Sequence, residues 1–168
     1  KSKLAPAFGK PATAGRESLR KTLARERAKA KGETERPRLV LASASPRRLT
    51  LLAQVGVTPH ALRPSSIDES AERGESPRRL VARLARAKAE ASRDQISNDR
   101  DIADSYILAA DTIVSYGKKI LMKPSHVEEA MASLQLLSGR VHKVFSAVCL
   151  ITPDDRIREC LSKLALDL

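Results

Sequence analysis

The predicted fold follows first from one short segment, Leu39-Val40-Leu41-Ala42-Ser43-Ala44-Ser45-Pro46-Arg47-Arg48. Its apolar first half predicts a short buried strand over residues 39–43. Ser45 and Pro46 then predict a helix, with the serine as N-cap and the proline as first helical residue, where a missing N–H costs nothing. A strand that passes through a short polar loop into a helix is the opening unit of an α/β domain.

This strand–helix junction also predicts an anion site. Free backbone N–H groups and the positive end of the helix dipole point at one spot beyond the N-cap. Two serine hydroxyls and two guanidiniums lie beside that spot, from Ser43, Ser45, Arg47 and Arg48. Cations in a first helical turn oppose the dipole by about 0.3–1 kcal/mol each. A bound phosphate chain would reverse that penalty, whereas plain surface charge, the alternative for the two arginines, would keep it.

The charge distribution separates a basic extension from a body. The chain has 168 residues and a net charge of +11, and its length suits one domain with a sizeable core. Residues 1–38 hold 12 Lys and Arg against 4 Glu, while residues 39–168 hold 19 Lys and Arg against 16 Asp and Glu. We therefore expect a basic flexible extension over 1–37, which binds nucleic acid weakly at most, and one domain over 38–168.

The remaining composition narrows the class of protein. Few aromatic side chains are present for stacking on bases, which disfavours a single-strand binding platform. No apolar run approaches the roughly 18 residues of a membrane span, and no signal-peptide pattern is visible. The two cysteines lack metal-binding spacing, and Cys149 lies in an apolar run that predicts a buried thiol. We expect a cytoplasmic protein without membrane partners.

The apolar patterns alternate between strand and helix periods and predict an α/β domain. The second helix begins with Ser76 and Pro77 as N-cap and first residue, and the third with a capping box of Ser125 and Glu128. The predicted helices cover 46–55, 77–93 and 125–137, and the predicted strands 39–43, 106–110, 113–116, 120–122, 141–152 and 157–161. We expect loops over 56–75 and 94–104.

Carboxylates follow two of the extended segments. Asp111 and Thr112 come directly after the predicted strand 106–110, and the carboxyl ends of strands are where ligands bind in α/β sheets. Asp68 and Glu69 lie in the loop before the second helix. An Asx turn at Asp111 and a solvated acidic loop are the alternatives. Together with the phosphate loop, these carboxylates suggest a nucleotide bound with Mg²⁺, which prefers one or two carboxylates plus phosphate oxygens.

Two lysines are placed to neutralise phosphate charge. Lys88 lies beside the apolar stripe of its helix, where its ammonium either extends to solvent or reaches a buried anionic site. Lys123 ends the predicted hairpin just before Pro124. His142 has two interpretations, a ligand contact or a histidine hydrogen-bonded for structural reasons.

These motifs occur in the order and approximate spacing seen in Maf proteins, and the resemblance covers residues 38 to about 163 but not the extension. The matching stretches are Leu41-Ala42-Ser43-Ala44-Ser45-Pro46-Arg47-Arg48, Ile67-Asp68-Glu69, Arg86-Ala87-Lys88, Ala110-Asp111-Thr112, Lys123-Pro124 and Ser138-Gly139-Arg140 followed by His142. The resemblance implies a Maf/ITPase-like mixed twisted sheet flanked by helices. It also implies a cytoplasmic nucleoside triphosphate pyrophosphatase, often a homodimer, that depends on Mg²⁺ or Mn²⁺.

Residue roles follow from the same resemblance. It implies that Asp111 is the proton acceptor that activates water, that Glu69 is a second catalytic carboxylate, and that both hold the metal. It further implies that Arg47 and Thr112 place the chain in the dTTP/UTP pyrophosphatase branch. The substrate-binding residues it implies are Ser43, Ser45, Arg47, Arg48, Lys88, Thr112 and Lys123.

The final residues depart from the resemblance. Maf proteins continue for several more elements, and residues 164–168 do not resemble the strand expected there, so we expect a domain that lacks the usual C-terminal part. The reaction implied is hydrolysis of the α–β phosphoanhydride to a nucleoside monophosphate and pyrophosphate. The alternatives are a non-catalytic nucleotide-binding protein and a pyrophosphatase of the 7-methyl-GTP branch.

Overall fold

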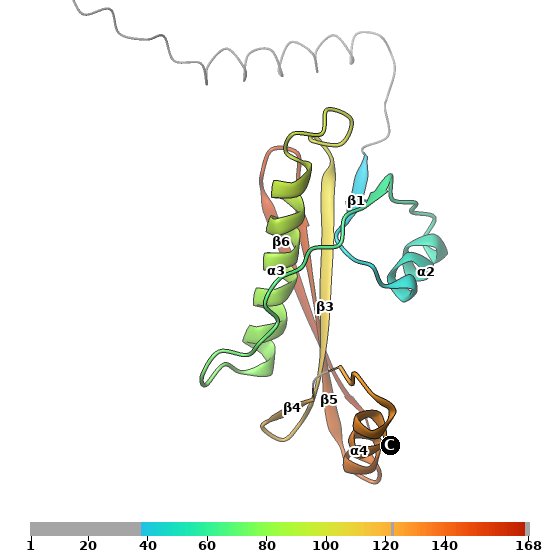
Figure 1. The fold of residues 1–168 in the computed structure, drawn as a ribbon, viewed down its shortest axis with the longest axis vertical. Coiled ribbons are helices and arrows are strands. Elements are labelled where there is room, and N and C mark those ends of the chain that lie inside the picture. The colour runs from blue at the N-terminus through green and yellow to red at the C-terminus, as the bar shows by residue number, and fades with distance from the viewer. Residues whose placement is uncertain (1–37, 122, 167–168) are drawn as a thin grey trace, which may run out of the picture. The chain divides into compact units, whose positions relative to one another are not determined.

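The computed structural model describes residues 38–121 and 123–166, and the expectations for residues 1–37 lie outside this part. Its strands form one mixed sheet in the order β2-β1-β3-β5-β6, with β4 paired to β3 (Figure 1). The α/β class and the mixed sheet flanked by helices are therefore confirmed. The elements are β1 Leu39–Leu41, α2 Pro46–Gln54, β2 Ala61–Leu62, α3 Pro77–Ile96, β3 Tyr106–Tyr116, β4 Lys119–Leu121, α4 Val127–Leu137, β5 His142–Ile151 and β6 Ile157–Leu166.

The sheet changes from parallel to antiparallel pairing at β3. Strand β1 runs parallel to both β2 and β3, and α3 lies in the connection that a parallel neighbour requires. Strands β3, β5 and β6 are antiparallel, with Asp111 opposite Ala147 and Phe145 opposite Lys163. The β3–β4 hairpin turns at Gly117, whose φ of 57° favours glycine. This hairpin agrees with the one predicted from the sequence.

Helix α3 covers one face of the sheet, where it packs against β3 and β5 (Figure 1). Odd-numbered side chains are the buried ones along β3 from Ile107 to Ser115 and along β5 from Phe145 to Ile151, as the two-residue period of a strand requires. The buried core comprises Val40, Leu80, Val81, Leu84, Ala85, Ala89, Ile96, Ile107, Ala109, Ile113, Phe145, Ala147, Cys149 and Ile151, among others. Burial of each large side chain contributes roughly 1.5–3 kcal/mol. None of the helices in the described ranges is long and apolar enough to cross a membrane.

The prediction that a strand ends at Ala110 is wrong, because β3 continues through Tyr116 without a break. Asp111 therefore lies in the middle of an 11-residue strand and not at its carboxyl end. The strand tolerates a buried carboxylate there because Lys88 of α3 supplies a counter-charge. The continuous backbone ladder to β5, from Ile107 to Ser115, holds the acidic residue in register.

Other boundaries also differ. Helix α4 begins after the N-cap His126, and the predicted capping box is wrong because Glu129, in place of Glu128, accepts the Ser125 backbone N–H at 2.8 Å. Helix α3 continues to Ile96, which is buried, and the loop before α3 contains the short strand β2. Strand β6 continues past the predicted end at 161 to Leu166, because β5 offers a pairing partner along that whole length.

Candidate functional site

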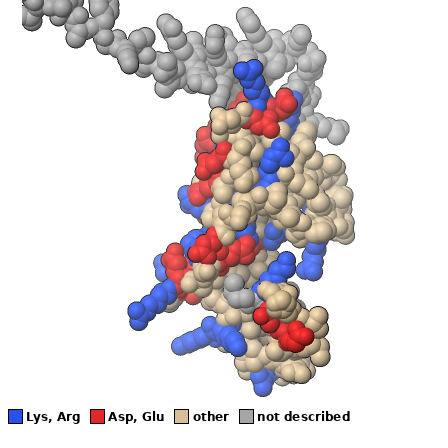
Figure 2. Space-filling view, in the orientation of Figure 1, with Lys and Arg blue, Asp and Glu red and all other residues tan. Residues whose placement is uncertain are grey.

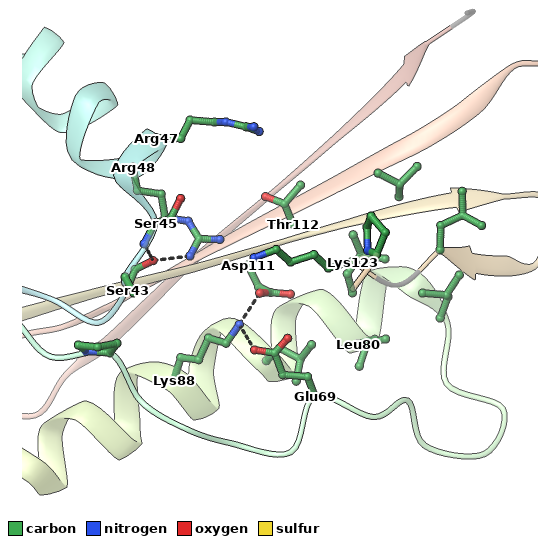
Figure 3. A pocket seen from close by; sticks show the side chains of 18 of the residues that line it. Ser43, Ser45, Arg47, Arg48, Glu69, Leu80, Lys88, Asp111, Thr112 and Lys123 are labelled. Carbon is green, nitrogen blue, oxygen red and sulfur yellow. Dashed lines mark hydrogen bonds and ion pairs between the residues drawn. The ribbon is translucent and has the colours of Figure 1, made fainter. Parts of the chain in front are cut away.

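A cleft of about 940 Å³ brings all of the predicted site residues together (Figure 3). The β1–α2 loop and the first turn of α2 form one wall, and α3, β3 and the segment before α3 form another. The predicted residues that line the cleft are Ser43, Ser45, Arg47, Arg48, Glu69, Lys88, Asp111, Thr112 and Lys123. Residues from five separate parts of the sequence thus share one cavity.

The β1–α2 loop is organised around the hydroxyl of Ser43. Its Oγ accepts hydrogen bonds from Arg48 Nη1 at 2.7 Å and from the backbone N–H of Ser45 at 3.2 Å. Ser45 is the N-cap of α2 as predicted, yet its hydroxyl makes no capping bond. Pro46 follows at the first helical position. The Ser45 hydroxyl, which lines the cleft, therefore stays available to a ligand at the start of α2.

The two arginines of this loop differ in their surroundings. Arg48 is half-buried and held by Ser43, whereas Arg47 is exposed and forms no hydrogen bond or ion pair with any residue in the described ranges. Acidic residues are absent from the first turn of α2. The positive charges of Arg47 and Arg48 thus lie at the positive end of the α2 dipole without an acidic partner in that turn. A bound anion would stabilise this arrangement.

Opposite this loop, one ammonium group joins two carboxylates. Lys88 Nζ lies 2.6 Å from Asp111 Oδ1 and 2.7 Å from Glu69 Oε1 (Figure 3). Lys88 is 11% exposed and Asp111 10%, while Glu69 is 53% exposed at the cleft opening. Of the two interpretations of Lys88, the structure supports the buried anionic site. The three groups carry a net charge of −1, which attracts a further cation.

Helix periodicity explains why Lys88 reaches this point. Lys88 follows the buried Leu84 by one helical turn, so its stem leaves α3 on the face that packs against the sheet. The stem crosses apolar surface, and the ammonium then meets Asp111 on the facing strand. Ser65 donates its hydroxyl to the Lys88 carbonyl at 3.2 Å and ties the preceding segment to the same turn.

The donor set at this point fits a divalent cation with few protein ligands. No cluster of three or more His, Cys, Asp or Glu side chains occurs in the parts of the chain that the structure describes. Asp111 and Glu69 supply two carboxylates that converge on a single charged atom. Mg²⁺ commonly takes one or two carboxylates and completes its shell with water and substrate phosphates. The pair therefore suits a metal that arrives with a nucleotide.

Thr112 points to the opposite side of β3 from Asp111, as neighbouring residues of a strand do. Its Oγ1 lies 3.0 Å from the hydroxyl oxygen of Ser146 on β5. Sequence reasoning gave no role to Ser146, because a serine in a strand carries no distinguishing pattern. Apolar lining residues were missed for the same reason; among them are Leu80, Leu84, Ile113, Val114, Ile120 and Leu137.

Two residues considered in the sequence lie away from the cleft. Asp68 accepts the Ser70 backbone N–H at 2.9 Å, and hydrogen bonds with the Ser70 side chain and then with its backbone N–H lower the pKa of the Asp68 carboxyl below the ordinary value. It does not line the cavity, in contrast to its neighbour Glu69. His142 is buried, with Nδ1 3.4 Å from the Arg140 carbonyl oxygen, which supports the structural interpretation.

Comparisons with known proteins agree on the family. A sequence model of the Maf-like protein family matches residues 38–165. A dTTP/UTP pyrophosphatase of Rhodopseudomonas palustris is 56% identical over 126 residues, which cover 75% of this chain and 61% of that protein. A dTTP/UTP pyrophosphatase of Nitrobacter hamburgensis is 54% identical over 128 residues, 76% of this chain and 62% of that protein.

The chain thus spans about three fifths of the length of these relatives. Among solved structures, the Staphylococcus aureus Ham1 protein matches with a TM-score of 0.50 and 12% identity, over 78% of this chain and 71% of that one. That likeness concerns the fold alone. The family match covers most of the chain and includes every residue that lines the cleft. The chain belongs to the family of Maf-like proteins.

Proposed function

We propose that the cleft binds a nucleoside triphosphate with a divalent cation and hydrolyses its α–β phosphoanhydride, with dTTP or UTP as substrate. The observation that carries this proposal is the convergence of Asp111 and Glu69 in a cavity that also holds Arg47 and Arg48. The name of the relatives, dTTP/UTP pyrophosphatase, supports the substrate class. A cleft with cations on one wall and carboxylates on the other suits a polyphosphate that must be both held and attacked.

In the proposed reaction Asp111 is the general base. Its carboxylate takes a proton from water while the water oxygen forms a bond to the α-phosphorus. The bond between that phosphorus and the bridging oxygen then breaks, and pyrophosphate leaves with the electron pair. A positioned base of this kind contributes about 10²–10⁴-fold to the rate. The backbone pairing of Asp111 in mid-strand keeps its carboxylate fixed relative to the β1–α2 loop.

The cationic side chains hold the phosphate chain in this proposal. Arg48, oriented by Ser43, and the exposed Arg47 bind phosphoryl oxygens, with the hydroxyl of Ser45 and the ammonium of Lys123 as further contacts. Charge-assisted bonds of this type contribute roughly 1.5–3 kcal/mol each. A Mg²⁺ or Mn²⁺ ion bound by Asp111 and Glu69 would supply charge stabilisation at the phosphoryl oxygens.

Lys88 has a different role here from the phosphate contact that the family resemblance implies. Its ammonium is engaged by both carboxylates in the structure. We therefore propose that Lys88 keeps the two acidic groups together before the nucleotide and metal arrive. We propose that Arg47 and Thr112 select the nucleobase of the substrate.

The experiment is product analysis on a panel of nucleotides. The 168-residue chain is incubated with dTTP, UTP, 7-methyl-GTP and ATP in Mg²⁺ or Mn²⁺, and phosphorus NMR identifies the products. We expect monophosphate and pyrophosphate from dTTP and UTP. Release of a nucleoside diphosphate and inorganic phosphate would contradict attack at the α-phosphorus. Preferred turnover of 7-methyl-GTP would favour the other branch, and nucleotide binding without products would favour a non-catalytic binder.

A further inference from the structure

The position of Glu69 depends on a segment without regular structure. Residues 63–76 connect β2 to α3, and Glu69 lies in the middle of this segment. Its side chain is half exposed and is joined to the rest of the site through Lys88. A carboxylate on such a segment can meet Asp111 reproducibly only if the backbone beside it is held, because an unsupported loop samples many positions.

Arg83 of α3 supplies that support. Its Nη2 donates to the carbonyl oxygen of Ser70, the residue directly after Glu69, at 2.9 Å. Its Nε and Nη2 also donate to the two carboxylate oxygens of Glu75, at 2.9 and 2.8 Å. One guanidinium thus joins the residue after Glu69 to the residue before the α3 N-cap Ser76.

Glu75, the partner of Arg83, is itself held by hydrogen bonds to Glu72. Glu75 Oε2 accepts the Glu72 backbone N–H at 3.1 Å, and the Glu75 backbone N–H donates to the Glu72 carbonyl at 3.0 Å. The Glu75 side chain is 8% exposed and that of Arg83 33%. The hydrogen bonds from Arg83 lower the pKa of Glu75, so its carboxylate stays charged at neutral pH. The network therefore stays intact over the range in which an enzyme is assayed.

Arg83 does not line the cleft, and its hydrogen bonds go to Glu75 and Ser70 and not to the cleft carboxylates Glu69 and Asp111. We infer that Arg83 is a positioning residue, whose guanidinium fixes the backbone after Glu69 and so sets that carboxylate beside Asp111. The inference rests on the proposed function, since it gives the fixed carboxylate a metal to hold. A planar guanidinium can donate to both oxygens of the Glu75 carboxylate and to the Ser70 carbonyl at once. The ammonium of a lysine lacks these parallel donors.

The same helix offers a matched control in Arg86. Arg86 Nε pairs with Glu90 Oε1 at 2.8 Å, an exposed contact within α3 that does not involve residues 63–76. Replacement of either arginine removes one positive charge from the same helix. Arg83 loses its ion pairs with Glu72 and Glu75, and Arg86 loses the one with Glu90. Only the replacement of Arg83 removes a bond to the segment that carries Glu69.

The test compares Arg83→Gln, Arg83→Lys, Glu75→Gln and the double variant Arg83→Gln/Glu75→Gln with Arg86→Gln. Hydrogen exchange of residues 65–75 reports the segment, Mn²⁺ binding followed by electron paramagnetic resonance reports the carboxylates, and dTTP turnover reports kcat and KM. For Arg83→Gln we expect faster exchange and Mn²⁺ affinity weakened by about 10–100-fold, the usual effect of losing a group that orients a metal ligand. We also expect a lower kcat with little change in KM.

The remaining variants make the result specific. Arg83→Lys should lie between the wild type and Arg83→Gln, and the double variant should be no worse than Arg83→Gln because both changes remove one shared interaction. Unchanged exchange or unchanged Mn²⁺ affinity in Arg83→Gln would overturn the inference, as would an equal effect of Arg86→Gln. A wild-type chain that neither binds Mn²⁺ nor hydrolyses dTTP would overturn the proposed function, while its exchange pattern would still show whether Arg83 holds the segment.

Discussion

At the scale of single residues, Lys88 is a largely buried cation whose ammonium contacts the carboxylates of both Asp111 and Glu69. Replacement by Met would leave Asp111 and Glu69 facing each other without a counter-charge. We expect Lys88→Met to lower the free energy of unfolding by about 3 kcal/mol, as when one partner of a buried ion pair is removed. Urea unfolding with EDTA would measure this, and added Mg²⁺ should restore part of the loss.

Lys118 provides the control for this substitution. It lies exposed in the hairpin turn beside Gly117, and Lys118→Met should change the free energy of unfolding by no more than about 0.5 kcal/mol. Equal effects of the two substitutions would contradict the view that Lys88 compensates buried negative charge.

The two cysteines should differ in reactivity. Burial, as the leading cause, raises the pKa of the Cys149 thiol to about 11, and its side chain is inaccessible, whereas Cys160 is exposed on β6. Because the thiolate is the reactive form, a raised pKa leaves Cys149 protonated at pH 8. Dilute folded protein should therefore react at Cys160 alone with an alkylating reagent, with Cys149 following on denaturation. Mass spectrometry after digestion would identify the sites, and equally fast labelling of Cys149 in folded protein would contradict its buried position.

Residue chemistry was predictable where the type of side chain and its local position both carried information. Ser43 and Arg48 were found because they lie at a strand–helix junction, where the positive helix end and the cationic side chains favour an anion. Asp111 was found as a carboxylate after an apolar run, although the premise that the strand ends before it is wrong. The partner of Lys88 was not predictable, because Asp111 lies 23 positions away in the sequence. Arg83 was missed for a related reason. In the sequence it is one of several arginines of α3, and only its contacts with the folded loop before α3 set it apart from the exposed ones.

At the scale of elements, the serine N-caps predicted for α2 and α3 behave differently. Ser76 Oγ accepts the Arg79 backbone N–H at 3.3 Å, whereas the Ser45 hydroxyl caps nothing in α2. We expect Ser76→Ala to lower the free energy of unfolding by about 1 kcal/mol, the usual contribution of a cap, and Ser45→Ala to have a smaller effect. Ser45→Ala should instead weaken nucleotide binding. Urea unfolding and dTTP titration of both variants separate the two roles, and the reverse ranking in stability would contradict them.

Element types were predicted better than element ends. The β3–β4 hairpin and the start of α3 followed from local signals, namely Gly117 and the Ser76-Pro77 pair. The continuity of β3 through Asp111 and the extension of β6 to Leu166 depend on the antiparallel partner β5. Pairing partners are distant in sequence, so propensity alone could not set these ends.

At the scale of the whole molecule, neither charge sign dominates the face that Figure 2 shows. Acidic and basic side chains interleave on the face seen in Figure 2, in keeping with the small surplus of basic residues over 39–168. Apolar side chains are exposed on the side of β5 and β6 turned away from α3. We call this surface the β5–β6 apolar face, and it comprises the exposed Val148, Leu164 and Leu166 together with the half-buried Val144.

We expect the homodimer implied by the family resemblance to form through the β5–β6 apolar face, because β6 also ends the sheet as an edge strand within the described residues. Light scattering over a concentration series should show the mass rising toward twice that of the chain. Leu164→Lys should return the mass to that of a single chain. Leu51→Lys on α2 is the control, because Leu51 and Leu164 are both 55% exposed. A single-chain mass for the wild type at every concentration would contradict this prediction.

The proposed role of Asp111 is tested most directly by the rate of pyrophosphate release from dTTP in Mg²⁺, measured for the wild type, Asp111→Asn and Asp68→Asn. Asp68 is the matched control, a carboxylate next to Glu69 that does not line the cleft. We predict that Asp111→Asn loses about 10²–10⁴-fold in rate while still binding dTTP, and that Asp68→Asn keeps the wild-type rate. An Asp111→Asn chain that releases pyrophosphate as fast as the wild type would contradict the proposed reaction.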